Sequence, residues 1–288
     1  MNENSLSNEN IEWDSVIGQQ KKRLNFNFGE IWKYRDLMTL FVKRDIVTVY
    51  KQTILGPLWF VIQPLLTTLM YLLVFTNIAG IKTGAVPPIL FYMLGITLWN
   101  YFSETLNITS KTFIDNASVF GKVYFPRVVL PISKSISGFV KFLIQFSLFL
   151  VIWLYYVFIE KSIAPNIYML LAPLFLFAIV VMGFSFGILI SSLTTKYRDL
   201  MFLVSFGVQL VMYATPVIIP LSGVHGKKRI IFLLNPLTSL FEGFKSGFLG
   251  SGLVEWKWIG YSVGFTVILL FVGIASFNKI EKKFIDTV

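Results

Sequence analysis

Long apolar runs separated by shorter polar segments dominate the pattern of this chain. A helix of about 20 mostly apolar residues crosses the hydrocarbon core of a bilayer, and six of the runs are close to that length. The pattern therefore predicts an all-α integral membrane protein with six transmembrane helices. The predicted spans are residues 58–80, 89–107, 136–158, 167–193, 200–220 and 258–278.

The polar segments at the two ends complete the predicted domain organisation. Residues 1–30 are polar and lack a charged-then-apolar signal pattern, so we expect a disordered cytoplasmic N-terminus and no cleaved signal peptide. Residues 31–288 are expected to form a single transmembrane domain. Within it, residues 31–51 precede the six spans between 58 and 278, and residues 279–288 form a cytoplasmic tail.

Residues 31–51 are patterned as an amphipathic interface helix rather than as a span. Tyr34, Leu37, Met38 and Phe41 recur at helical spacing, and charged residues occupy the other faces. Such a helix is expected to lie along the inner headgroups of the membrane. It serves either as a plain surface anchor or as a lever that touches a cytoplasmic partner.

Basic residues predict the orientation of the chain in the membrane. With a cytoplasmic N-terminus, 17 of the 25 lysines and arginines fall on the cytoplasmic side, 7 fall outside, and Lys141 lies within the third run. Basic residues concentrate in cytoplasmic loops, so both termini are predicted to be cytoplasmic. The net charge of +10 is therefore attributed to membrane topology, and no nucleic acid is expected as a partner.

Several classes of chemistry are excluded or disfavoured by composition. The chain has no cysteine and one histidine, His225, which falls in a predicted outer loop. A Gly-x4-Gly-Lys-Ser/Thr phosphate-binding loop is also missing from the sequence. We therefore expect no metal site, no catalytic residue and no cofactor in this chain, and no ATP hydrolysis by the chain alone.

The segment between the fifth and sixth runs predicts outer gate helices. Asn235 is suited to cap a helix that begins at Pro236, and Phe241, Phe244 and Phe248 then fall on one apolar stripe. A two-part amphipathic element here is expected to dip back into the outer leaflet as a re-entrant gate. The alternative is a helix that rests on the outer surface.

Polar and aromatic residues within the spans are candidates for a transport path. Snorkelling toward the inner surface is the favoured interpretation of Lys141. Glu104 is expected either to pair with a basic residue near the third span or to face a wet pathway. The aromatic residues belong to interface belts or helix packing, or serve as stacking platforms for sugars. The path candidates are Trp59, Phe60, Trp99, Tyr101, Glu104 and Tyr213.

Four ordered motifs add a more specific signal. They are Tyr50 to Trp59 with Gln63-Pro64; Lys122 to Arg127 with Pro131; Tyr197-Arg198-Asp199 with Ala214 to Ile218; and Leu234 to Leu237 with Glu242 and Lys245. Together they resemble the permease subunit of ABC-2 type exporters of polysaccharides, the O-antigen and capsule or teichoic-acid export family. Two departures are Lys245, where arginine is expected, and Ile219, where tyrosine is commoner.

The resemblance implies a division of labour. Two copies of this chain form a homodimeric path in the bacterial cytoplasmic (inner) membrane, and two copies of a separate ABC ATPase bind MgATP below them. The substrate is a polyprenyl-pyrophosphate-linked glycan that moves from the cytoplasmic to the periplasmic leaflet. Lys51, Lys122 and Arg127 are expected to share the tasks of attracting the pyrophosphate and contacting the ATPase.

The resemblance also implies roles for individual residues. The inner-loop motif is Tyr197, Arg198 and Asp199. The outer gate is Asn235, Pro236, Phe241, Glu242 and Lys245. The residues expected to couple to the ATPase are Lys43, Arg44, Lys51, Gln52, Lys122, Tyr124, Phe125, Pro126 and Arg127.

Four other functions compete with this interpretation. An exporter of the same fold could carry another substrate, such as teichoic acid, capsule, a drug or a small lipid. A membrane-embedded glycan enzyme would need acidic or histidine-rich outer loops, which are sparse here. An ion-coupled carrier or channel would need buried acids at mid-membrane or inverted repeats, and we find neither. A purely structural anchor would not need the ordered aromatic and proline motifs.

Overall fold

The computed structural model describes residues 28–51, 56–120, 125–194, 197, 199–252 and 254–285. All regular elements in these residues are helical, so the predicted all-α fold is confirmed. The main helices are α1 (Phe28–Lys33), α2 (Arg35–Lys51), α3 (Trp59–Tyr71), α4 (Pro88–Ser110), α5 (Thr112–Asp115), α6 (Ala117–Phe120), α7 (Val129–Phe158), α8 (Ala172–Thr194), α9 (Leu200–Tyr213), α10 (Lys227–Leu234), α11 (Pro236–Leu249) and α12 (Trp256–Ile285).

Four helical segments of the described chain are long and apolar enough to cross a membrane. They are Trp59–Ile78, in which α3 continues as a π-helical segment, Val129–Phe158, Ile167–Thr194 and Trp256–Ile280. These four correspond to the first, third, fourth and sixth predicted spans. The chain is therefore a multi-pass membrane protein.

The other two predicted spans are helices that fall outside this group. α4 has 23 residues, but Asn100, Glu104 and Asn107 lower its hydropathy, and most of its residues are buried by other helices. α9 has only 14 residues, which corresponds to about 21 Å at 1.5 Å per residue. That length is shorter than the roughly 30 Å hydrocarbon core. The six-span topology therefore stays a prediction.

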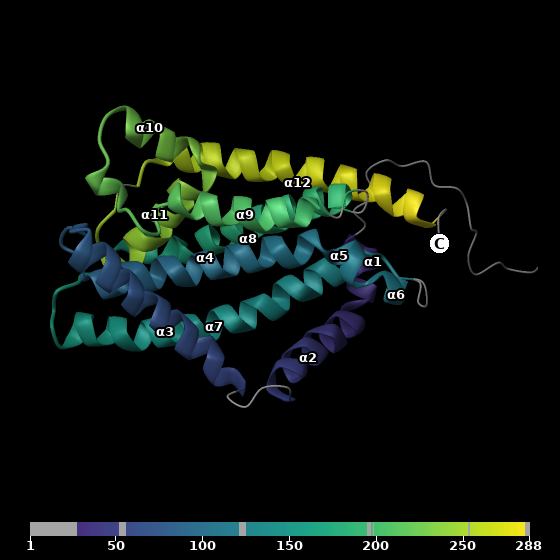
Figure 1. The fold of residues 1–288 in the computed structure, drawn as a ribbon, viewed down its shortest axis with the longest axis horizontal. Helices are drawn as coiled ribbons and strands as arrows, with labels where there is room; N and C mark the ends of the chain where they lie inside the picture. Colours follow the sequence, from purple (N-terminus) through teal and green to yellow (C-terminus); the bar gives the residue numbers. More distant parts are fainter. Residues whose placement is uncertain are drawn as a thin grey trace, which may run out of the picture.

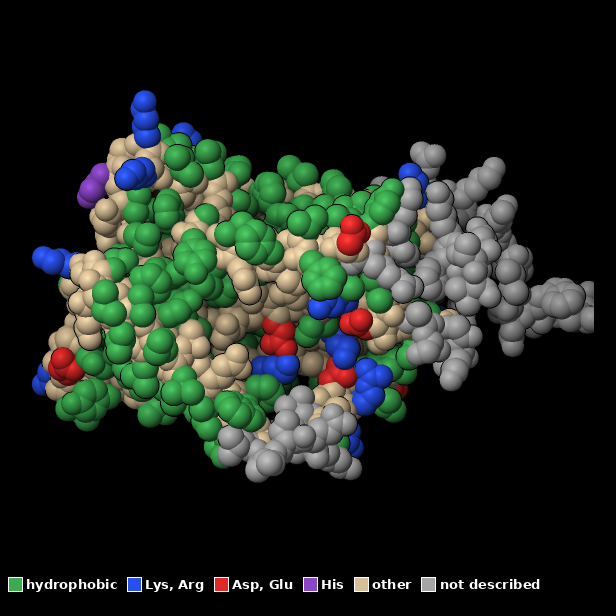
Figure 2. Space-filling model, viewed as in Figure 1, with side chains coloured by type: hydrophobic (Ala, Val, Ile, Leu, Met, Phe, Trp, Pro, Cys, Tyr) green, Lys and Arg blue, Asp and Glu red, His purple; other side chains and the backbone are tan. Residues whose placement is uncertain are grey.

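The long helices lie side by side along the long axis of the molecule (Figure 1). α10 and the start of α11 lie near one end of the bundle, whereas α5, α6 and the end of α12 lie at the other. The segments predicted to be outside and inside the membrane therefore gather at opposite ends. Figure 2 shows hydrophobic side chains over most of the visible flank between these ends.

Several predicted boundaries were wrong. α7 begins at Val129 instead of 136, because Pro131 lies in the first turn, where a proline removes no intrahelical bond. α9 ends at Tyr213 instead of 220, since Pro216 disfavours helix in the preceding residue. α12 continues to Ile285, so much of the predicted tail extends the last helix. The interface helix is interrupted by a turn at Tyr34.

Close helix packing around α4 forms the core of the bundle. α4 packs extensively against α7 and α8, and α8 packs against α12. A Cβ at Gly187 would lie 2.5 Å from the Thr109 Cβ, and one at Gly183 would lie 3.0 Å from the Phe102 carbonyl oxygen. Both glycines thus allow α8 to approach α4 closely, as small residues commonly do between membrane helices.

Candidate functional site

The predicted interface helix is attached to the start of α7 through an aromatic cluster. Phe41 of α2 is buried against Phe125, Val129 and Leu130, with ring centroids 6.0 Å apart for the two phenylalanines. Phe125 also contacts the ring of Phe120 at 5.8 Å. The apolar stripe of α2 therefore packs on the residues at the start of α7.

An ion-paired cluster lies beside this contact. Asp45 of α2 accepts from Lys134 of α7 at 2.8 Å and from Arg44 at 3.0 Å. The Ser137 hydroxyl donates to the Ser133 carbonyl at 3.0 Å and lies 3.5 Å from the same carboxylate. The Asp45 side chain is only 16% exposed, so this carboxylate is neutralised within a partly buried environment. It links α2 to α7 a second time.

A second ion pair lies about two turns further along α7. The Lys141 ammonium of α7 donates to the Glu104 carboxylate of α4 and lies 5.4 Å from the centroid of the Phe60 ring. Glu104 therefore pairs with a basic residue of the third predicted span, which is one of the two alternatives left open by the sequence, and the snorkelling of Lys141 toward the inner surface stays a prediction. One turn further, the Asn100 amide donates to Gln145 at 3.4 Å. α4 and α7 therefore share a polar stripe.

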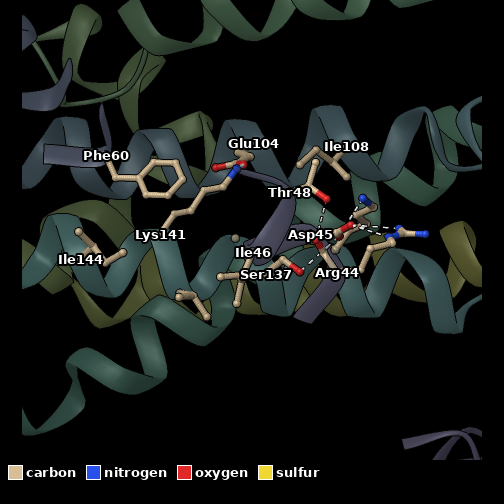
Figure 3. Close-up of a pocket in the computed structure, with 13 residues that line it drawn as sticks. Arg44, Asp45, Ile46, Thr48, Phe60, Glu104, Ile108, Ser137, Lys141 and Ile144 are labelled. Carbon is tan, nitrogen blue, oxygen red and sulfur yellow. Dashed lines mark hydrogen bonds and ion pairs between the residues drawn. The ribbon is translucent and has the colours of Figure 1, made fainter. Parts of the chain in front are cut away.

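These groups line a recess of about 350 Å³ between α2, α3, α4 and α7, here called the ion-paired recess. Figure 3 shows Lys141 and Glu104 directed toward one another beside Phe60, with Asp45, Arg44 and Ser137 further to the right. Figure 2 shows acidic and basic side chains gathered in one hollow of an otherwise hydrophobic face. Its lining residues are Arg44, Asp45, Ile46, Thr48, Phe60, Glu104, Ile108, Lys134, Ser137, Gly138, Val140, Lys141 and Ile144.

At the other end of the bundle, Asn235 joins two helices. Its side-chain oxygen accepts from the Leu237 amide at 3.1 Å and so caps α11, as predicted. Its amide nitrogen donates to the Ala214 carbonyl at 3.0 Å and to the Thr215 hydroxyl at 2.9 Å, just after α9 ends. A single side chain therefore satisfies polar groups at the start of one helix and the end of another.

We expect Asn235→Ala to lower the free energy of unfolding by about 2 kcal/mol. The substitution removes a cap, which contributes about 1 kcal/mol, and two further hydrogen bonds. Asn235→Asp retains the accepting oxygen and should lose less. Thermal unfolding of the purified chain in detergent measures both effects, and an alanine variant as stable as the wild type would contradict the bridging role.

α11 is buried over almost its whole length. Its apolar stripe, including Phe241 and Phe244, packs against α4, α8 and α12. Pro236 occupies the first turn, and Gly250 ends the helix in the left-handed conformation with φ 66°. The predicted two-part element is present as α10 and α11. Its re-entrant position in the outer leaflet and its role as a gate remain predictions.

Lys245 attaches α11 to two other parts of the chain. Its ammonium donates to the Pro216 carbonyl and lies 3.6 Å from the centroid of the Phe91 ring on α4. The side chain is only 2% exposed. Burial lowers the pKa of Lys245 to about 7, and the neighbouring Glu242 carboxylate opposes this shift. Desolvation therefore disfavours the charged form of this amine, whereas the Glu242 carboxylate favours it.

The residues predicted to couple to the ATPase divide into three groups. Lys43 is exposed on α2, and Arg44 lines the ion-paired recess. Phe125 is buried, Pro126 accepts the Val129 amide at 3.0 Å, and Arg127 lies over the Phe120 ring at 5.3 Å. Phe125 and Arg127 therefore contact other parts of the chain, and the contact of these residues with an ATPase stays a prediction. Gln52, Lys122, Tyr124 and the Lys51 side chain lie outside the described part of the chain.

The other predicted residues are scattered. Trp59 and Tyr213 are exposed, Phe60 and Glu104 line the recess, and Trp99 and Tyr101 are buried in the core. In the inner-loop motif, Tyr197 is exposed and Asp199 precedes α9, whereas Arg198 lies outside the described residues. The proposed roles in the path and in the inner loop stay predictions.

The sequence predictions missed the residues that build the recess with Glu104 and Arg44. Asp45, Lys134, Ser137 and Lys141 were not selected as site residues. A signal was available, because Lys134, Ser137 and Lys141 are spaced three and four residues apart and so share one face of a mostly apolar helix. Asp45 carried no comparable signal, since it lies in a helix with many charged residues.

Comparison with known proteins gives this helical architecture a family. The chain belongs to the ABC-2 type transporter family, which matches it over residues 37–249. It is therefore a membrane-embedded transport subunit. This assignment agrees with the multi-pass fold and with the four ordered motifs of the sequence.

Three curated relatives carry the comparison further. Two proteins from Klebsiella pneumoniae, each named O-antigen export system permease protein RfbA, are 28% identical over 267 residues and 27% identical over 265 residues. Each match covers 92% of this chain and 98% of the relative. A protein of the same name from Myxococcus xanthus is 26% identical over 261 residues, covering 90% and 98%. They confirm the resemblance to O-antigen export permeases.

Proposed function

We propose that this chain is the permease subunit of an ATP-driven exporter of polyprenyl-pyrophosphate-linked polysaccharide, such as O-antigen. The observation that carries the proposal is the similarity to three O-antigen export permeases over at least 90% of this chain and 98% of each relative. Transport is directed from the cytoplasmic to the periplasmic leaflet of the bacterial inner membrane, and both termini of the chain are cytoplasmic.

Two copies of the chain form the path, and two copies of a separate ATPase supply the energy from MgATP. The contacts of α2 with the start of α7 support a mechanical role for the predicted coupling residues. Phe41 and Phe125 make one link between the two elements, and Asp45 with Lys134 makes another. Closure of the ATPase pair moves α2, and these links pass the movement to a candidate span.

Affinity purification tests the partnership. The tagged chain is isolated from native membranes in mild detergent, and its partners are identified by mass spectrometry. The proposal expects a near-equal amount of a Walker-motif ATPase. A chain that purifies alone, under conditions that preserve other membrane complexes, would instead indicate a stand-alone carrier.

The aromatic link offers a test of coupling. Phe125→Leu should lower the export rate about fivefold while the ATPase activity of the complex persists, because an aromatic pair contributes about 0.5–1.5 kcal/mol beyond its buried area. Export and ATP hydrolysis are measured on the same preparation. Phe139→Leu is the matched control, because this phenylalanine is on α7 but packs on Tyr101 of α4 and is not part of the cluster around Phe41. Equal losses of both activities would contradict a role in coupling.

A further inference from the structure

The ion-paired recess has an unequal balance of charge. Its described lining includes three cations, Arg44, Lys134 and Lys141, but only two carboxylates, Asp45 and Glu104. Each carboxylate is already paired with a cation, and Asp45 is paired with two. The lining therefore has a surplus positive charge in a half-buried space of about 350 Å³.

We propose that the ion-paired recess binds the phosphate group of a phosphorylated lipid, with Lys134, Arg44 and Lys141 as its cationic contacts. The proposal rests on the proposed function only for the identity of the lipid. A polyprenyl phosphate carrier and an ordinary anionic phospholipid share this chemistry, and the experiment below separates them.

The arrangement around Asp45 explains how a phosphate is accommodated. Lys134 and Arg44 hold the same carboxylate, so one of them can turn to a phosphate oxygen while the other keeps Asp45 neutralised. The Ser137 hydroxyl, which lies 3.0 Å from the Ser133 carbonyl and 3.5 Å from Asp45, can redirect its single proton to a phosphate oxygen. Bonds from ammonium or guanidinium groups to phosphate are among the stronger hydrogen bonds in proteins.

The remaining walls suit the apolar part of a lipid. Four apolar side chains line the recess together with the ionic groups. They are Ile46 of α2, Phe60 of α3, Ile108 of α4 and Ile144 of α7. Phe60 and Ile144 belong to candidate membrane spans. A headgroup at Lys134 would therefore lie beside the apolar surface that its first chain carbons need.

The recess also places such a lipid against the predicted lever. α2 supplies Arg44, Asp45 and Ile46 to one wall, and the same helix is attached to α7 through Phe41 and Phe125. Occupation of the recess changes the partners of Asp45. The state of the lipid site is thereby communicated to the element that is proposed to contact the ATPase.

Lipid binding by the full chain in complex with its ATPase provides the test. The complex is placed in nanodiscs of phosphatidylethanolamine that contain increasing fractions of polyprenyl phosphate or, separately, of phosphatidylglycerol. Bound lipid is counted by native mass spectrometry. Lys134→Gln should weaken binding of the preferred lipid about tenfold, because it removes one charge-assisted bond. Lys111→Gln, which removes a charge from the inner end of α4 outside the recess, should leave binding unchanged.

Asp45→Asn separates ligand binding from a structural role. It removes the competing carboxylate and should tighten phosphate binding about fivefold, because two cations are released toward the ligand. If the Asp45 pairs only fixed α2 in place, Asp45→Asn and Lys134→Gln would change binding in the same direction. Opposite changes therefore support the site.

The remaining outcomes are also decisive. Stronger binding of polyprenyl phosphate than of phosphatidylglycerol identifies the carrier as the ligand, and equal binding identifies an ordinary phospholipid. Identical effects of Lys134→Gln and Lys111→Gln would overturn the proposal. The phosphatidylglycerol series needs no glycan, so it remains informative if the chain exports another substrate. Conversely, a recess that binds no lipid in a complex that still exports glycan would refute only this inference.

Discussion

Lys245→Ala is expected to destabilise the protein by about 3–5 kcal/mol, one of the two largest effects that the structure predicts. The substitution deletes the bond to the Pro216 carbonyl and the cation–π contact with Phe91, and it leaves space where a fully buried side chain was. The result would be a looser attachment of α11 to α4 and to the turn after α9. The apparent melting temperature of the purified complex measures the effect.

Two control variants separate the contributions of Lys245. Lys245→Met retains much of the packed volume but removes the ammonium, so it should lose less stability than the alanine variant. Lys228→Ala removes an exposed lysine from α10, and a change of less than about 0.5 kcal/mol is expected there. An alanine variant at Lys245 with the same melting temperature as Lys228→Ala would show that the contacts of this lysine are dispensable.

Glu104→Lys is expected to abolish most of the export activity and to destabilise the chain by about 3–5 kcal/mol. The substitution brings a second ammonium beside Lys141 in a site where both side chains are less than one-third exposed. Removing one partner of a poorly solvated ion pair leaves the other charge uncompensated, which is costly. Export and the melting temperature are measured on the same preparation.

A charge swap provides the rescue experiment. Glu104→Lys combined with Lys141→Glu restores an ion pair between α4 and α7, and it should recover most of the lost stability. Recovery of stability without recovery of export would mean that the position of the ammonium matters for transport. A Glu104→Lys variant with normal stability would contradict the pairing of these two helices.

The helical class and four of the six predicted spans could be found from the sequence because they depend on local hydropathy, whereas helix ends depend on particular residues. Pro131 looked like a loop residue but is accommodated in the first turn of α7, which therefore begins at Val129. Pro216, in contrast, is not accommodated in a helix: α9 ends at Tyr213, three residues before it. α4 is a buried central helix, so its surroundings permit polar residues that lower the hydropathy of the second predicted span.

The candidate site was less predictable than the fold because it is assembled by packing. Glu104 was selected from the sequence as a polar residue within a predicted span, and its pairing was one of two open alternatives. Lys134 looked like an ordinary basic residue of an inner loop. Asp45 reaches Lys134 only because α2 packs on α7, and Phe41 and Phe125 make a second contact between these two parts of the chain across a long sequence separation.

The aromatic path candidates show a further limit of sequence reasoning. Trp99 packs against Phe102 and Phe241, and Tyr101 stacks on Phe142, so both belong to the core of the chain. Trp59, by contrast, is exposed at the start of α3. Hydropathy does not distinguish an aromatic residue that packs between helices from one that faces a path or lipid, because both are surrounded by apolar neighbours.

ATP-dependent movement of lipid-linked glycan into inverted membrane vesicles tests the central claim most directly. In these vesicles the cytoplasmic face is outward, so export carries the glycan into the lumen, where an added glycosidase cannot reach it. We predict that ATP makes the glycan protected when this chain and its ATPase are present, and that a Walker-motif variant of the ATPase prevents this. Glycan that stays fully accessible with an active ATPase and intact chain would contradict the proposed export function.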